Sequence, residues 1–239
     1  MNGLIWSLFS IFFLISCAQR IKVPINRTMS PEAIGGGFEV EYKKTGFSQG
    51  VLQFENGEMD NPLLMSQLQE DELYMGLGIS NNADLFLKIP KESSSIVGIK
   101  VQVIGDPSKA RSTGHNLAFT LGMGNERDSF DEGLSINLKS DVQDYSIIHG
   151  YRFNETLMVY EGVSISTFQF DGKINNAPSG FSGDSFSYRA NNILGAHAGL
   201  EIGSAAFKLR IELGLQRIEW SNTDAQNFRF LGYSLSSTF

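Results

Sequence analysis

The last thirteen residues of the chain, 227–239, alternate strictly between two kinds of side chain and end on a phenylalanine. Leu231, Tyr233, Leu235 and Phe239 fall on one side of this alternation, and small residues fall on the other. A period of two is the pattern of a β-strand. Terminal residues usually fray unless secondary structure holds them. A large apolar residue in the last position therefore predicts that the C-terminus is paired in a sheet.

The same alternation recurs along most of the chain. It predicts about ten strands, at 35–43, 73–79, 85–89, 97–103, 117–123, 145–153, 156–167, 194–202, 207–215 and 227–239. The connections are short and long in turn: short at 81–83, 154–155 and 203–204, and long and polar at 45–70, 125–141 and 169–188. This arrangement predicts an all-β, antiparallel up-and-down transmembrane β-barrel of about ten strands, with eight or twelve as alternatives.

One strand, 156–167, departs from the pattern because Glu161 shares a face with apolar neighbours. Either a bulge at Glu161-Gly162 shifts the alternation, or the prediction that this face contacts lipid is wrong here.

The hairpin around Gly203-Ser204 has a polar face. With a two-residue turn, His197 would lie opposite Arg210. The polar face comprises His197, Glu201, Lys208, Arg210 and Glu212. We expect these five residues to form a structural polar network that fills a narrow lumen. A catalytic role for His197 is the alternative.

The C-terminal pattern resembles the assembly signal of bacterial outer-membrane β-barrels, carried here by Tyr233, Leu235 and Phe239. The resemblance implies a Gram-negative outer-membrane location, contact with outer-membrane lipids, and recognition by the barrel-assembly machinery. An even number of strands would place the N- and C-termini on the same, periplasmic side.

The N-terminus has an apolar run from Leu4 to Ile15, followed by the only cysteine of the chain. Leu14-Ile15-Ser16-Cys17 resembles the lipobox of bacterial lipoproteins. The resemblance implies a signal peptide at 1–16, action of the lipoprotein-processing machinery, and lipid such as palmitate on Cys17. We expect 17–34 to be a lipidated tether and 35–239 to be the barrel. A plain signal peptide with a chance cysteine is the alternative.

Other functional classes find little support in the sequence. A net charge of −7 without a basic cluster argues against nucleic-acid binding. The three histidines, His115, His149 and His197, lack metal-ligand spacing, and we predict no metal and no cofactor. The His-x-Ser pattern of barrel lipid hydrolases is absent, because Leu117, Tyr151 and Gly199 stand two positions after the histidines.

We therefore expect a non-enzymatic outer-membrane barrel lipoprotein. Its role would be envelope-structural, surface interaction, or transport of a small or hydrophobic ligand that the sequence does not identify. Two alternatives stay open. One is a barrel hydrolase that uses His197 or the acids of the 125–141 segment, which are Asp128, Asp131 and Glu132. The other is a soluble β-sandwich or lipocalin-like lipoprotein tethered to the membrane.

Overall fold

The computed structural model describes residues 19–24, 29–55, 58–60, 66–130, 135–175, 185–220 and 225–239. Within these ranges the regular secondary structure is entirely β. The strands are β1 (Gln19–Pro24), β2 (Gly37–Glu55), β3 (Glu58–Asp60), β4 (Ser66–Gly78), β5 (Ala83–Pro90), β6 (Ile96–Ile104), β7 (Gly114–Phe130), β8 (Ser135–Asn154), β9 (Leu157–Asn175), β10 (Ser185–Gly203), β11 (Phe207–Trp220) and β12 (Gln226–Thr238). None of the described residues belongs to a helix long and apolar enough to cross a membrane.

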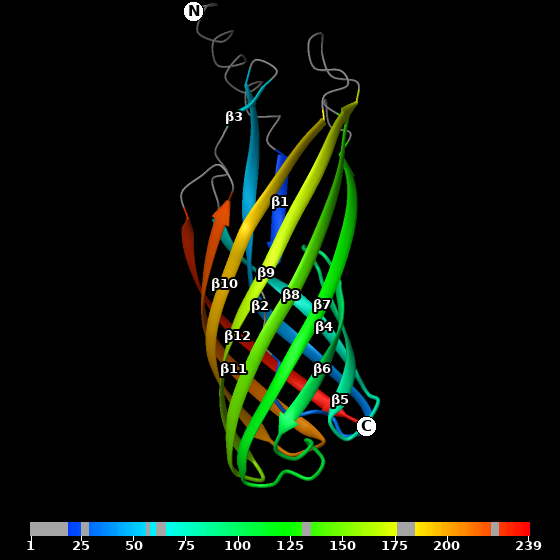
Figure 1. Ribbon diagram of the computed structural model, residues 1–239, viewed down its shortest axis with the longest axis vertical. Coiled ribbons are helices and arrows are strands. Elements are labelled where there is room, and N and C mark those ends of the chain that lie inside the picture. The colour runs from blue at the N-terminus through cyan, green and yellow to red at the C-terminus, as the bar shows by residue number, and fades with distance from the viewer. Residues whose placement is uncertain are drawn as a thin grey trace, which may run out of the picture.

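The strands close into an antiparallel barrel (Figure 1). β2 pairs with β4 on one side and with β12 on the other, and β4 to β12 pair in chain order. Of the twelve strands in the described chain, β1 and β3 pair only with β2 and are not members of the closed ring. The ring therefore has ten strands. The predicted up-and-down barrel of about ten strands is confirmed.

The C-terminal strand occupies the predicted position. β12 pairs with β11 along its length, and its second half pairs with the start of β2, from Tyr233 opposite Lys44 to Thr238 opposite Glu39. Phe239 extends this closure through two backbone hydrogen bonds with Phe38, of 2.8 and 3.1 Å. Phe239 as a whole is 75% exposed, so its contact with β2 is made mainly by its backbone.

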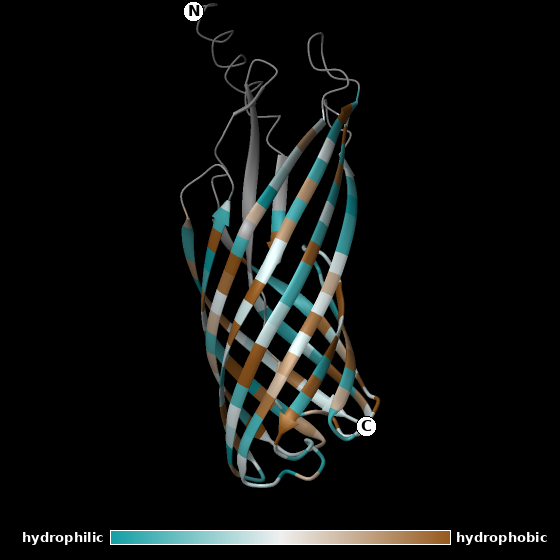
Figure 2. Cartoon of the chain, viewed as in Figure 1, coloured by the Kyte–Doolittle hydropathy of each residue, from teal (hydrophilic) through white to brown (hydrophobic). Residues whose placement is uncertain are grey.

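The segments predicted as long loops are largely strand. β2, β7, β8, β9 and β10 run through most of 45–70, 125–141 and 169–188. Polar composition predicts loops in these segments, but a strand whose outer face is polar has the same composition. The two-residue alternation of buried and exposed residues in fact continues along these strands. Hydrophilic and hydrophobic residues follow one another along the long strands (Figure 2).

β9 and β11 show this exchange clearly. On β11 the outward residues from Phe207 to Leu215 are apolar, and the next two are Arg217 and Glu219. Its inward residues change in the opposite sense, from Lys208, Arg210, Glu212 and Gln216 to Ile218 and Trp220. On β9 the outward side changes from Val163 and Ile165 to Thr167, Gln169, Asp171 and Lys173, while the inward side changes from Ser164 and Ser166 to Phe168 and Phe170.

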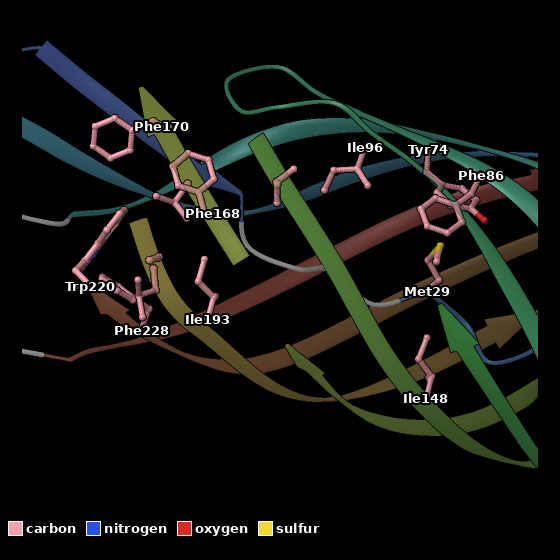
Figure 3. Packing of buried hydrophobic residues seen from close by; sticks show 14 of the residues in the cluster. Met29, Tyr74, Phe86, Ile96, Ile148, Phe168, Phe170, Ile193, Trp220 and Phe228 are labelled. Atoms are coloured by element: carbon pink, nitrogen blue, oxygen red, sulfur yellow. The ribbon is translucent and has the colours of Figure 1, made fainter. Parts of the chain in front are cut away.

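The barrel therefore has two zones. The zone next to the short turns is apolar outside, and its interior holds most of the buried charged residues beside an apolar group that includes Met29, Phe86 and Ile148. The zone beyond it is polar outside and contains an aromatic cluster, in which Phe168, Phe170, Trp220, Phe228 and Ile193 lie together (Figure 3).

No bulge occurs at Glu161-Gly162. Glu161 pairs in register with His149 on β8 and with Ala198 on β10. The irregularity in the β9–β10 pairing lies at Ala190/Ile193 instead. Glu161 therefore points outward among apolar residues, with its side chain 72% exposed.

The N-terminal segment differs from the tether predicted for 17–34. β1 pairs with residues 47–52 of β2, and residues 29–34 are buried inside the barrel. Met29 lies with Tyr74, Phe86 and Ile148 in the interior (Figure 3). Three consecutive glycines, Gly35, Gly36 and Gly37, have φ of 78°, 83° and 99°, and this left-handed backbone lets the chain reverse into β2. Cys17 and the signal peptide lie outside the described residues.

Gln19 and Phe239, the first and last described residues, lie at opposite ends of the barrel. The N-terminus itself, which we predicted to share the periplasmic side with the C-terminus, lies outside the described residues. Gln19 pairs with Leu52, near the far end of β2, whereas Phe239 pairs with Phe38 beside its start. The physical reason is that residues 29–34 run through the lumen, which adds a crossing that strand counting did not include.

The contact between β2 and the C-terminus gives a test of barrel closure. A Cβ on Gly37 would lie 2.4 Å from the carbonyl oxygen of Phe239, whereas a Cβ on Gly36 meets nothing within 4 Å. Both glycines have positive φ, so both alanine variants place a side chain on left-handed backbone, and only Gly37→Ala adds the close contact with Phe239. We expect Gly37→Ala to lower the folded fraction in a heat-modifiability gel well below that of Gly36→Ala. Equal folded fractions for the two variants would contradict this closure.

Candidate functional site: the charged lumen

The five residues predicted to form the lumen network all lie buried inside the barrel. The exposed fractions are 8% for His197 and Glu212, 4% for Arg210, 2% for Lys208 and 0% for Glu201. Their alternation on β10 and β11 places them on the inner face, opposite the apolar outer one. Buried charges are stable only when they are paired, so the partners of these residues define the site.

Arg210 is the hub of the network. Its Nε donates to Glu201 Oε2 at 2.9 Å, and its two terminal nitrogens bond Glu41 at 2.8 Å and Glu39 at 3.1 Å. Lys208 adds an ion pair with Glu39 at 3.0 Å. Because Glu39 and Glu41 lie on β2, these bonds connect the first ring strand to β11 across β12.

The hairpin register is offset from the predicted one. Gly203 pairs with Lys208, so Glu201 lies opposite Arg210 and His197 lies opposite Gly214. The connection is longer than two residues, and Ser204 N donates to the Phe207 carbonyl within it. The offset is even, so each side chain keeps its predicted face while its cross-strand partner changes. The predicted contact between His197 and Arg210 is therefore wrong.

A second cluster joins the lumen network to the N-terminal segment. Arg152 donates to Glu201 at 2.7 Å and makes a two-point contact with Glu32, in which Nη2 lies 2.7 Å from Oε2. Arg111, from the turn region before β7, lies 3.5 Å from Glu201 and donates to the backbone carbonyls of Gly203 and Ser204. The Glu201 carboxylate therefore forms ion pairs with three guanidinium groups, those of Arg111, Arg152 and Arg210.

The backbone of residues 29–34 is bound on another side of the lumen. The Ile34 N–H donates to both carboxylate oxygens of Asp84, at 3.0 and 3.1 Å, and the Ala33 N–H donates to Gln102 Oε1 at 2.6 Å. Lys100 donates to the Glu32 carbonyl at 2.6 Å and pairs with Asp84 at 3.0 Å. This segment is therefore an internal plug, bonded to β5, β6 and β8.

A small cavity lies beside these groups. It has a volume of about 20 Å³ and is lined by Lys43, Thr45, Tyr160, Arg210, Glu212 and Phe230. A cavity needs about 10–15 Å³ to hold one water molecule, so this one has room for a single water.

His197 lies beside the network without an ionic partner among the described residues. Its ring centroid is 6.5 Å from that of Tyr160, whose hydroxyl donates to Glu212 at 3.1 Å. Its Nε2 is buried and has no hydrogen-bond partner in the described chain. These contacts are those of a packed interior residue next to a polar network.

The other two histidines meet on the outer surface, where their sequence spacing gave no indication of contact. His115 Nδ1 lies 3.0 Å from His149 Nε2, and His149 Nδ1 lies 3.5 Å from Glu161. The pairing of β7 with β8 brings together residues that are 34 positions apart. Within the described ranges, no group of three or more His, Cys, Asp or Glu side chains is arranged to hold a metal ion.

Sequence reasoning missed several members of the site. Glu39 and Glu41 were on the polar side of a predicted strand, and Arg152 was on the polar side of another, so their inward direction could have been predicted. The roles of Glu32 and Arg111 had no comparable signal, because neither belongs to an alternating segment.

Comparison with known proteins gave structural likenesses only. No protein-family model matches the chain, and no curated protein matches it in sequence. The attachment invasion locus protein Ail of Yersinia pestis is 13% identical, with 85% of this chain and 97% of that chain covered and a TM-score of 0.34. Neisserial surface protein A is 12% identical, with the same coverages and a TM-score of 0.39. The outer-membrane protease OmpT of Escherichia coli is 8% identical, with 93% and 96% covered and a TM-score of 0.37.

The network gives a stability prediction. Removal of one partner of a buried ion pair costs about 3–5 kcal/mol because it strands the opposite charge. We expect Glu201→Ala to lower the free energy of unfolding, measured with urea in detergent micelles, by about that amount, since Arg152 and Arg210 lose a shared partner. The control is Glu219→Ala on the exposed face of β11, which should change it by less than about 0.5 kcal/mol. Equal effects of the two substitutions would rule out a stabilising role for the network.

Proposed function

We propose that this chain is a non-enzymatic β-barrel of the bacterial outer membrane, with a closed lumen and a role in envelope structure or surface interaction. The observation that carries the proposal is the apolar outer band on the turn side of the barrel. Its residues include Leu77, Val97, Met123, Ile147, Val163, Leu213, Leu215, Leu231 and Tyr233, which are 45–63% exposed.

The dimensions of this band suit a bilayer. On β11 it runs from Phe207 to Leu215, and on β9 from Leu157 to Ile165. Nine residues on a tilted strand match the roughly 9–11 residues of a membrane-spanning strand. A soluble β-sandwich would bury such side chains between its sheets, because water-exposed apolar patches of this extent are rare. A lipid environment satisfies them.

The closed lumen favours a structural or surface role over transport. The ion pairs around Arg210 and the plug at 29–34 occupy the interior on the turn side, and the aromatic cluster occupies it further along. The hydrolase alternative centred on His197 gains no support from its contacts, which are the ring of Tyr160 and the surrounding interior.

The zone beyond the band offers a surface for interaction. Two hollows of about 430 and 350 Å³ lie on its outer side and share Asn137 and Lys139. Further lining residues are Arg127, Asp128, Asp171 and Lys173. Charged groups of both signs make this a polar contact surface. Lipidation of Cys17 belongs to the same proposal and is supported by the lipobox alone.

A proteoliposome swelling assay tests the closed lumen. The purified chain is reconstituted into vesicles, with folding verified by heat-modifiable migration, and arabinose is used as the permeant solute. We expect swelling no faster than that of empty vesicles, because charged side chains and the plug fill the interior. Swelling at the rate of an open porin would overturn the proposed closed barrel and restore the transport alternative.

A further inference from the structure

The N-terminal part of the described chain connects the two ends of the barrel. β1 descends along β2, from Gln19 opposite Leu52 to Pro24 opposite Phe47. Residues 29–34 then lie in the lumen, and Gly35–Gly37 reverse the chain into β2 beside Phe239. The segment therefore passes from the loop end to the turn end through the inside of the barrel.

Both ends of this path are held by specific contacts. At the loop end, Lys22 donates to Glu92 at 2.7 Å, and this hydrogen bond from the lysine ammonium lowers the pKa of the Glu92 carboxyl. Val23 is fully buried in the same apolar cluster as Met29. In the lumen, Glu32 binds Arg152 and the Ile34 N–H binds Asp84. An N-terminal segment outside the barrel could not reach Arg152 or Asp84, which are buried in the interior.

The register of β1 gives its height above the apolar band. On β2 the outward apolar residues end at Tyr42, and Lys44 is the first polar one. Leu52, the partner of Gln19, lies eight positions further along the strand. At about 3.3 Å per residue on a strand tilted by roughly 40°, this is about 20 Å beyond the band.

We infer that β1, which begins at Gln19, lies at the loop end, on the cell exterior, and that the chain enters the lumen from that end to reach Met29. The inference rests on the proposed function, which places the loop end outside the cell.

Epitope tags on intact cells test the inference. One tag is inserted between Ala18 and Gln19, a second within 176–184 at the loop end, and a third between Ser112 and Thr113 at the turn end. Each protein is checked for heat-modifiable migration, and antibody binding is measured before and after permeabilisation. We expect the first two tags to be detected on intact cells and the third only after permeabilisation.

The other outcomes separate the two proposals. If the 176–184 tag is detected on intact cells and the Ala18 tag only after permeabilisation, lumen threading to the exterior is overturned and the outer-membrane barrel stands. If the Ser112 tag is exposed and the 176–184 tag is not, the orientation fails, and the inference fails with it.

A cross-link tests the path without an inserted tag. Paired β-residues have Cα separations compatible with a disulfide. In a Cys17→Ala background, Arg20→Cys with Val51→Cys should form a disulfide in the folded barrel, because these residues pair between β1 and β2. The control is Arg20→Cys with Leu235→Cys on β12, which should not. Absence of the first disulfide, or equal yields of both, would overturn the path.

Discussion

Backbone pairing between β2 and β12 is the contact on which the rest of the structure depends, because it joins the first ring strand to the last. Without it, both strands would present unpaired N–H and C=O groups, which water could satisfy but a bilayer could not. The pairing is short, from Lys44–Tyr233 to Glu39–Thr238, and ends in the Phe38–Phe239 hydrogen bonds. The ion pairs from Arg210 and Lys208 to Glu39 and Glu41 reinforce the same closure from inside, across β12.

The buried charges around Arg210 and Arg152 are arranged so that acidic and basic groups contact one another. Glu201 accepts bonds from Arg152 and Arg210, and Glu32 brings the N-terminal segment into contact with Arg152. An apolar lumen would need no paired charges. It could also enclose residues 29–34, but apolar packing is non-directional and would not fix their position along the barrel. In this barrel, the paired charges fix one register of the plug against β5, β6 and β8.

Much of the fold followed from the period of two, and the failures have identifiable causes. The alternation correctly predicted the closing strand 227–239, the inward direction of Glu201, Lys208 and Arg210, and the barrel.

The alternation could not predict where each strand stops, because a polar outward residue such as Gln169 or Lys139 has the same appearance in a loop and in a strand above a membrane. It could not predict the hairpin offset at Gly203, since an even shift preserves both faces. The plug at 29–34 lacks a periodic pattern, and only the tertiary structure reveals it. Glu161 was identified as irregular, but the sequence could not decide between a bulge and an outward carboxylate.

On β9 and β11 the exchange of polarity marks the membrane boundary, and the depth of labelled residues in a bilayer can be measured. Single cysteines at Ile165 and Gln169, two outward positions on β9, are introduced in a Cys17→Ala background and labelled with an environment-sensitive fluorophore in lipid vesicles. We expect blue-shifted emission quenched by nitroxide-labelled lipid at 165, and red-shifted emission quenched by aqueous iodide at 169. Aqueous quenching of equal strength at both positions would show that the apolar band lies in water and would overturn this boundary.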